Sequence, residues 1–224
     1  MQLYFAIIKI ENNLIIMKKH IYLVLAISLM NCPAVIPQEN KVPVEPGESW
    51  LNSQHQPEKL MDAIGLKEGM TIADIGAGRG RMTVFFSLRV GIKGNVYAND
   101  IDKDALTYLE HRCQSNNMTN VKTFPGKVDN PMLPSGEVDI AFMVSTYHHL
   151  DKPVEMMRNT IPCLKKDGVL VIVERDPVKT GQTGSESTSQ EKLKSDAQKA
   201  GFEIVKVNSE LLERDNIYFL KPKN

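Results

Sequence analysis

The sequence has few cysteines, few aromatic residues and no excess of either charge. Its three cysteines, Cys32, Cys113 and Cys163, are too far apart for a disulfide framework or a cysteine-based zinc site. Its 27 basic and 27 acidic residues give zero net charge, so electrostatic capture of nucleic acid is not expected. Hydrophobic residues still make up 42% of the 224 residues, which excludes a disordered or collagen-like chain. We therefore predict one globular domain with an appendage, and a small or neutral partner.

No apolar run near the N-terminus is long enough to span a bilayer as a helix. From Met17 onward a basic start precedes an apolar run over residues 21–30, about half the length of a membrane-spanning helix. This length and these flanks are typical of a signal peptide. Residues 1–32 resemble a bacterial lipoprotein signal, which implies export, lipidation of Cys32 and anchoring in a bacterial envelope.

Two alternatives to the leader remain open. The start codon could be misassigned upstream of Met17, which would make the segment a poorly ordered extension, or the apolar run could be a short helix docked on the domain. Either alternative leaves the protein in the cytoplasm. The leader is also the more basic part of the chain, since three lysines and one glutamate precede Cys32.

The rest of the sequence predicts a proline-rich linker over residues 33–49 and one domain over residues 50–224. Strands and helices alternate in this domain, and residues 175–189 form a polar loop. This alternation predicts an α/β fold, a doubly wound, mostly parallel sheet with helices on both faces. The predicted helices are 58–64, 81–90, 103–116, 153–161 and 190–200, and the predicted strands are 70–75, 95–99, 121–124, 138–144, 169–173, 202–207 and 217–220.

A glycine-rich turn follows the first predicted strand. Gly76, Gly78 and Gly80 lie between this strand and a helix, where doubly wound sheets bind nucleotide-like ligands. A dinucleotide fingerprint would need its third glycine at position 81, which is Arg81. Asp74, just before the turn, is better suited to an ammonium group than to a pyrophosphate. The turn therefore disfavours a nicotinamide-dependent oxidoreductase.

A second carboxylate stands at the end of the next predicted strand. Asp100 follows Gly80 by about twenty residues, the separation at which an acidic side chain accepts from both ribose hydroxyls. The glycine turn, this carboxylate and the strand order together indicate a site for an adenosine-containing ligand.

With these features, residues 56–220 resemble the class I S-adenosylmethionine-dependent methyltransferases. The segments that carry the resemblance are 64–70, 73–80, 96–102, 164–170 and 200–202. The resemblance implies a Rossmann-like seven-stranded sheet whose last strand inserts antiparallel, with S-adenosylmethionine as the cofactor.

The resemblance also implies which residues bind the cofactor. They are Asp74, Gly76, Ala77, Gly78, Gly80, Asp100, Ile101, Val128, Asp129 and Ser145. The glycines would cradle the methionine portion, and Asp74 would order the loop or reach the amino group through water. Asp100 would hold the ribose, and Ile101 would pack on the adenine. Lys127 stands where many relatives have an acidic residue for the adenine amino group, so either Asp129 substitutes or backbone and apolar contacts hold the adenine.

Tyr147, His148 and His149 are the predicted catalytic residues. They follow the fourth predicted strand, where relatives face both cofactor and acceptor, and a histidine can take a proton near neutral pH. The alternative is that one histidine caps the next helix while the other packs under the sheet edge. Adjacent histidines do not share a face as zinc ligands do, so no metal site is expected.

Three functions compete on this evidence. The first is a monomeric methyltransferase for a small-molecule acceptor, because the polar loop is too short for an acceptor-binding domain. Trp50 could belong to an N-terminal lid over the cofactor or simply pack in the core. The second is a non-catalytic S-adenosylmethionine-binding lipoprotein, which export away from the cytosol would favour. The third is the oxidoreductase that Arg81 disfavours.

Overall fold

The computed structural model describes residues 17–19, 42–181, 184 and 186–223. The predicted lipoprotein leader lies outside the described residues except for residues 17–19, and so does Cys32. The compact unit comprises residues 41–224. In the part of the chain that is described, no helix is long and apolar enough to cross a membrane.

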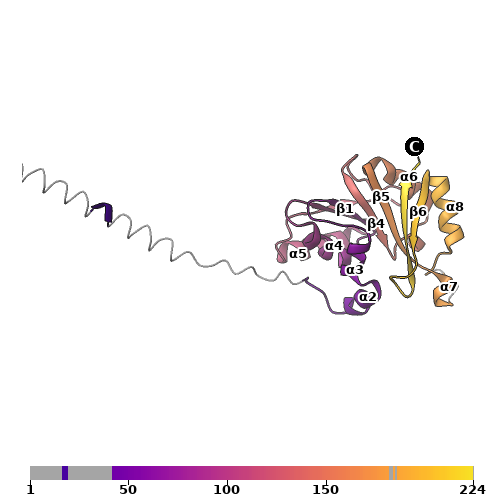
Figure 1. The fold of residues 1–224 in the computed structure, drawn as a ribbon, viewed down its shortest axis with the longest axis horizontal. Coiled ribbons are helices and arrows are strands. Elements are labelled where there is room, and N and C mark those ends of the chain that lie inside the picture. The colour runs from indigo at the N-terminus through magenta and orange to yellow at the C-terminus, as the bar shows by residue number, and fades with distance from the viewer. Residues whose placement is uncertain (1–16, 20–41, 182–183, 185, 224) are drawn as a thin grey trace, which may run out of the picture. The chain divides into compact units, whose positions relative to one another are not determined.

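The described residues form one seven-stranded sheet, which confirms the predicted α/β class (Figure 1). The strands lie in the order β3-β2-β1-β4-β5-β7-β6, and β7 is antiparallel to both of its neighbours. The first five strands are parallel, so their carboxyl ends meet at one edge. The strands are β1 Thr71–Ile75, β2 Asn95–Asp100, β3 Val121–Pro125, β4 Val138–Val144, β5 Leu164–Arg175, β6 Phe202–Asn208 and β7 Asp215–Pro222.

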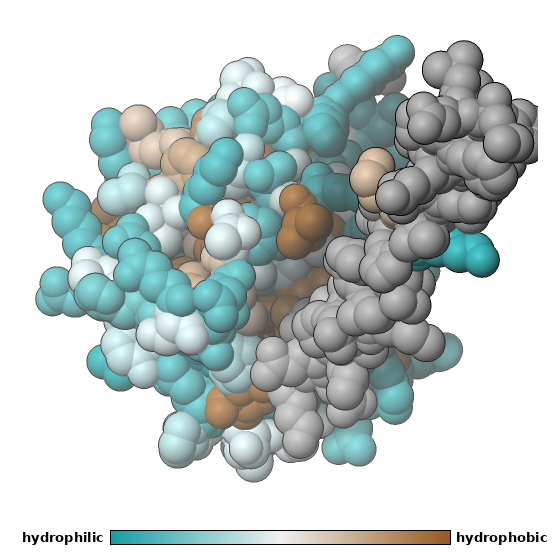
Figure 2. All heavy atoms as spheres, turned by 90° about the vertical axis from the view of Figure 1, so that its left-hand side faces the viewer, coloured by the Kyte–Doolittle hydropathy of each residue, from teal (hydrophilic) through white to brown (hydrophobic). Residues whose placement is uncertain are grey.

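Helices cover both faces of the sheet (Figure 1). Alternate residues of β4 show the two faces, because Phe142 packs in one hydrophobic core and Met143 in the other. The face that Figure 2 shows is mainly hydrophilic where its residues are coloured, as expected when apolar side chains gather in these cores. The helices are α2 Glu48–His55, α3 Pro57–Ala63, α4 Arg81–Val90, α5 Lys103–Ser115, α6 Pro153–Thr160, α7 Pro177–Thr180 and α8 Gln190–Ala200, with 3-10 turns η1 Tyr147–His149 and η2 Ile161–Cys163.

Local sequence explains several helix ends. The Asp102 carboxylate accepts from the backbone N–H groups of Asp104 and Ala105, as expected of the N-cap of α5. Ser189 caps α8 in the same way, and Gly201 ends that helix in the left-handed conformation. These boundaries confirm the predicted helices in both places.

Two short helices differ from the sequence predictions. The prediction began the helices at residue 58, yet α2 comes first and only His55 of its eight residues is buried. The sequence of α2 therefore lacks the periodic apolar residues from which a helix is predicted. The polar loop predicted over residues 175–189 contains the single turn of α7, capped by Asp176.

Residues 42–49, which the sequence assigned to the linker, lie within the compact unit. Arg112 of α5 holds them there, because its guanidinium donates to both carboxylate oxygens of Glu48 at 2.8 and 2.9 Å. It also donates to the carbonyl oxygen of Pro43 at 2.6 Å. This contact fixes the start of α2 next to the carboxyl edge of the sheet.

Candidate cofactor and acceptor site

The glycine turn joins β1 to α4 in a conformation that requires glycine. Gly76 has φ +78°, and a Cβ there would collide with the Thr146 side chain. Gly80 has φ +86°, and a Cβ there would collide with Leu109. Gly78, also with positive φ, has open space around the position of a Cβ. The turn therefore combines left-handed backbone with an open surface at its middle, as a ligand cradle needs.

Asp100 ties the glycine turn to the end of β2. Its Oδ2 accepts from the Gly78 N–H at 2.8 Å, and its Oδ1 accepts from the Asp102 N–H at 2.9 Å. A carboxylate has about four lone-pair sites, so both oxygens retain capacity to accept further hydrogen bonds. Asp100 thus orders the turn and remains able to bind a ligand hydroxyl.

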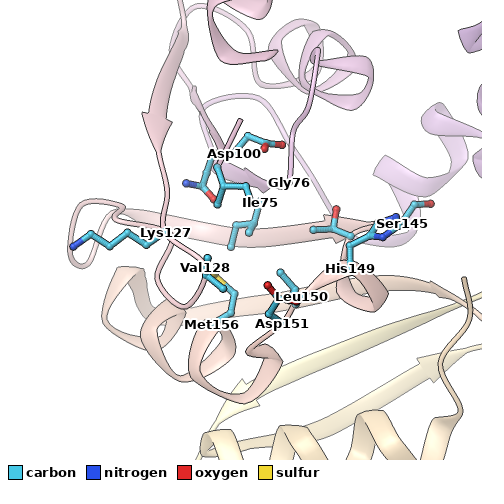
Figure 3. A pocket seen from close by; sticks show the side chains of 13 residues that line it. Ile75, Gly76, Asp100, Lys127, Val128, Ser145, His149, Leu150, Asp151 and Met156 are labelled. Atoms are coloured by element: carbon cyan, nitrogen blue, oxygen red, sulfur yellow. The ribbon is translucent and has the colours of Figure 1, made fainter. Parts of the chain in front are cut away.

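A cavity of about 280 Å³ lies at the carboxyl ends of β1, β2 and β4 (Figure 3). Ile101 and Val128 on its wall are 62% and 42% exposed, unusually open for apolar side chains. Lys127 extends away from the other labelled side chains. The lining residues are Ile75, Gly76, Asn99, Asp100, Ile101, Lys127, Val128, Ser145, Thr146, His149, Leu150, Asp151 and Met156.

A second cavity of about 140 Å³ adjoins the first at Gly76 and Ser145, which line both. Asp74 and Arg81 are the formally charged residues among the described residues of its wall. The remaining lining residues are Leu51 from α2 together with Ala77, Met82 and Val144. The two cavities thus share part of their wall, and the smaller one has the charged pair of Asp74 and Arg81.

Asp74 is buried at the wall of this second cavity. Its Oδ2 accepts from the Thr83 hydroxyl at 2.7 Å. Burial raises the pKa of Asp74 to about 6, and the hydrogen bond from Thr83 and the charge of Arg81 offset only part of that effect. The carboxylate is therefore ionised at neutral pH but close to its titration range.

Arg81 links the second cavity to α2. One guanidinium nitrogen donates to Asn52 Oδ1 at 3.0 Å, and another donates to His55 Nδ1 at 2.9 Å. Burial, followed by the charges of Arg81 and Arg175, lowers the pKa of His55 to about 3, so this imidazole is neutral and can accept. In the sequence, Arg81 only excludes the dinucleotide fingerprint, which needs glycine at position 81. Its basic side chain at the first position of the helix was the available signal.

Ser145 lies at the junction of the cavities in a strained conformation. Its φ of +51° is rare for a residue with a side chain, and such strain persists only where the surroundings impose it. Its N–H donates to the Val173 carbonyl at 3.2 Å, which ties the turn after β4 to β5.

The structure separates the three predicted catalytic residues. Tyr147 is buried, and its hydroxyl donates to Asp196 of α8 at 2.8 Å, away from both cavities. Burial, together with this hydrogen bond, raises the pKa of Tyr147 well above its usual range. His149 lines the larger cavity, and His148 Nδ1 lies 2.7 Å from Glu174 Oε1 on β5.

Seven of the ten predicted cofactor-binding residues line the two cavities, and three do not. Gly78 lines neither cavity, although its N–H donates to Asp100. Asp129 does not line either cavity, and its carboxylate accepts from Lys152 at 3.1 Å. Gly80 packs against α5 rather than facing a cavity. Among the described residues no cluster of three or more histidine, cysteine or acidic side chains could hold a metal ion.

Known proteins resemble this chain in sequence and in fold. Residues 72–168 match the family model described as a methyltransferase domain. The solved structure of a SAM-dependent methyltransferase from Aquifex aeolicus superposes with a TM-score of 0.71 and 26% identity, covering 79% of this chain and 93% of that one. Residues 72–168 therefore resemble a methyltransferase domain, and the chain shares the fold of that enzyme. S-adenosylmethionine is the cofactor that this domain implies.

Two curated relatives match about half of this chain. A probable cobalt-precorrin-6B C(15)-methyltransferase (decarboxylating) from Sulfurisphaera tokodaii is 32% identical over 48% of this chain and 54% of its own length. A ubiquinone/menaquinone biosynthesis C-methyltransferase from Vibrio parahaemolyticus is 25% identical over 51% of this chain and 44% of its own. This chain therefore spans about half the length of the curated relatives it matches.

Proposed function

We propose that the protein transfers a methyl group from S-adenosylmethionine directly to a small-molecule acceptor. The observation that carries the proposal is the pair of joined cavities at the carboxyl edge, with open apolar walls at one end and opposite charges at the other. S-adenosylmethionine has the same order of parts, an adenosine followed by a zwitterionic amino acid.

The larger cavity fits the adenosine part. Asp100 would accept from the ribose hydroxyls while it continues to order the glycine turn. Ile101 and Val128 offer exposed apolar surface on which an adenine ring can bury area. Asp129 is engaged by Lys152, so apolar and backbone contacts, rather than an acidic side chain, would hold the adenine in this protein.

The smaller cavity fits the amino-acid part. The buried Asp74 carboxylate would pair with an ammonium group, and the Arg81 guanidinium would pair with a carboxylate. Gly76 lines both cavities, and Gly78 beyond it has open space at the position of a Cβ. An ammonium group beside Asp74 also offsets the burial that raises the pKa of this carboxyl.

The protein's part in the reaction is mainly alignment and exclusion of water. When bound, S-adenosylmethionine supplies a sulfonium methyl group open to direct displacement. The chain must hold an acceptor atom within about 3 to 3.5 Å of that carbon. Leu51 on α2 closes one side of the smaller cavity, and Ser145 lies at the junction next to η1, where an acceptor can approach.

We call the ends of β4 and β5 together with the start of β7 the acceptor edge, comprising residues 145–149, 174–176 and 214–216. The loop between β5 and α8 adds only the single turn of α7 among its described residues. This supports a small acceptor, because the described residues of this loop form no additional acceptor-binding domain.

Isothermal titration of the full chain with S-adenosylhomocysteine tests the cofactor half of the proposal. We expect micromolar binding that Asp100→Asn weakens at least about tenfold, since a charge-assisted hydrogen bond contributes about 1.5–3 kcal/mol. Asp104→Asn, an exposed residue on the first turn of α5, is the matched control. Absence of binding at high micromolar ligand would overturn the proposal.

We also propose that residues 1–32 export the protein and that lipidated Cys32 anchors it in the envelope. The basic start and short apolar run support this, and they are sequence features only. Mass spectrometry of the mature N-terminus decides it, because a start at Met1 or Met17 contradicts processing at Cys32. A non-catalytic cofactor-binding lipoprotein is the second candidate function, favoured by this leader, and binding without transfer to any acceptor would support it.

A further inference from the structure

Glu174 is a buried carboxylate that the cofactor site does not use. Its side chain is 0% exposed, and its Oε1 lies 2.7 Å from His148 Nδ1. Its second oxygen, Oε2, is buried without a hydrogen-bond partner among the described residues. Burying a carboxylate with one oxygen unpaired costs several kcal/mol in general, so a role beyond packing is needed to explain this residue.

The pair of Glu174 and His148 lies beside the junction of the two cavities. His148 follows Ser145 by three residues, and Glu174 follows Val173, whose carbonyl accepts from the Ser145 N–H. The His148 ring packs on the His149 ring with centroids 4.1 Å apart, and His149 lines the larger cavity. The His148 side chain is 5% exposed and lines neither cavity, so the pair lies directly behind His149, which faces the proposed site.

The hydrogen bond to Glu174 fixes the orientation and the tautomer of His148. A carboxylate accepts from Nδ1–H, which leaves Nε2 as the acceptor atom of a neutral ring. No described residue hydrogen-bonds to Nε2. A histidine with Nδ1 held by a carboxylate and Nε2 available is arranged as a general base.

The charged and titratable groups around this pair come from three elements. Asp215 and Tyr218 of β7 and Tyr147 of η1 interact electrostatically with Glu174. Arg175 follows Glu174 and places a positive charge near Asp215, so charges of both signs surround the pair. Each phenol stays protonated near neutral pH, because burial raises the pKa of Tyr218 to about 12 and that of Tyr147 higher.

We propose that Glu174 is a positioning residue that holds His148 as the general base for an acceptor whose nucleophilic atom carries a proton, a hydroxyl group. This deepens the proposed function and rests on it. A thiol ionises at about pH 8.5 and partly supplies its own thiolate, whereas a phenol near 10 needs a base at neutral pH.

The reaction balances with the groups named. His148 Nε2 takes the hydroxyl proton, and the oxygen lone pair forms the new O–C bond as the sulfonium C–S bond breaks, its electron pair remaining on sulfur. The products are a methyl ether, the neutral thioether and an imidazolium paired with the Glu174 carboxylate. The imidazolium then returns its proton to water.

Nitrogen-15 NMR of the histidine-labelled full chain tests the positioning role without an acceptor. We expect neutral His148 in the wild type to carry its proton on Nδ1, and Glu174→Gln to shift the population toward the Nε2–H form. Asp196→Asn is the matched control, because it removes a buried carboxylate from the neighbouring Tyr147, and it should leave the His148 tautomer unchanged. An Nε2–H tautomer in the wild type, or equal effects of both variants, overturns the positioning role.

Transfer of a labelled methyl group from S-adenosylmethionine to a panel of phenols and thiols tests the acceptor class. We expect transfer to at least one phenol, with a loss of about 100-fold or more in kcat for His148→Asn. Unchanged S-adenosylhomocysteine binding by this variant would separate loss of the base from failure of the cofactor site. Transfer to thiols alone, an unchanged rate in His148→Asn, or no transfer by a wild type that binds the cofactor overturns the hydroxyl assignment.

Discussion

Buried polar and charged groups are hydrogen-bonded more completely at one edge of the proposed site than at the other. At the cofactor edge, residues 74–102, backbone amides satisfy Asp100 and a hydroxyl satisfies Asp74. At the acceptor edge and under α2, many polar groups are left incomplete. Five of the six buried polar side-chain atoms without a partner among the described residues belong to these two places: Asn52 Nδ2, Glu174 Oε2, Arg175 Nε, Arg214 Nε and Asn216 Oδ1.

This difference separates a preformed site from an incomplete one. Buried polar groups in native proteins are normally paired, and unpaired groups concentrate where function requires them. At the cofactor edge, Asp74 and Asp100 are hydrogen-bonded without a ligand and can still accept from one. The acceptor edge retains unpaired donors and acceptors that are buried and line neither cavity. The following predictions test the cofactor edge and the attachment of α2.

The largest expected effect follows from a methyl group added to the glycine turn. Gly76→Ala places a Cβ against Thr146 at positive φ, and overpacking with strain of about 3 kcal/mol corresponds to roughly 100-fold weaker binding. Titration with S-adenosylhomocysteine measures it. Gly136→Ala is the matched control, since it has φ +69° and open space at the Cβ, and equal losses would contradict a preformed cradle.

The next effect concerns the attachment of α2. Arg112→Ala leaves the largely buried Glu48 carboxylate unpaired and should lower the free energy of unfolding by about 3 kcal/mol. Urea denaturation measures this loss. Arg89→Ala, which breaks pairs with the exposed Glu58 and Asp62, should cost less than about 1 kcal/mol. Similar losses in both variants would mean that residues 42–49 do not depend on Arg112.

Asp74→Asn should raise the free energy of unfolding and weaken the binding of S-adenosylhomocysteine. The folded protein raises the pKa of Asp74 from 3.8 to about 6, so ionising this carboxyl destabilises the fold as pH rises through that interval. The variant should gain about 1 to 3 kcal/mol at pH 7.5, and the gain should shrink as pH falls toward 4. Denaturation at both pH values measures it, and a gain independent of pH would contradict the cause.

The same carboxylate predicts a pH dependence of binding. Affinity of the wild type for S-adenosylhomocysteine should fall as pH decreases below about 6, because protonated Asp74 no longer pairs with the ammonium group. Asp74→Asn should bind more weakly at pH 7.5 and lose this dependence. Titration calorimetry across pH 5 to 8 compares the two proteins, and parallel curves would remove Asp74 from the ligand site.

The smallest expected effect separates the two ends of the ligand. Arg81→Ala should weaken S-adenosylhomocysteine binding about tenfold, the effect of losing one charge-assisted hydrogen bond, and should spare 5′-methylthioadenosine, which lacks the amino acid. Arg79→Ala is the control, because Arg79 packs over Tyr108 and lines neither cavity. Equal weakening of both ligands would show that Arg81 acts through α2 instead.

Sequence patterns located the repetitive elements closely. The bounds of α4, β4 and α8 are those predicted, because the two helices have an apolar period and β4 is a nearly continuous apolar run. The sequence missed α2, whose residues are mostly exposed and whose N-cap Gly47 provides no side-chain hydrogen bond. Its position depends on contacts with Arg112 and Arg81, which no local pattern encodes.

In the candidate site too, some features could be predicted from the sequence and others depend on tertiary packing. The glycine turn and Asp100 could be predicted because they are close in sequence and their spacing follows from strand geometry. The pairing of His148 with Glu174 spans 26 residues, and that of Arg81 with His55 also spans 26. Sequence identified His148, Tyr147 and His149 as a group, and only packing directs them to three different surroundings.

The sequence alone determined that an α/β domain presents a glycine turn and a spaced carboxylate at one sheet edge, because local sterics and strand periodicity require it. Tertiary structure alone decided that Asp74 and Arg81 share a cavity and that Glu174 meets His148. The physical reason is that burial and charge pairing depend on which distant segments pack together. The few cysteines, few aromatics and balanced charge thus describe the domain as a whole, while its proposed chemistry lies in a small number of long-range contacts.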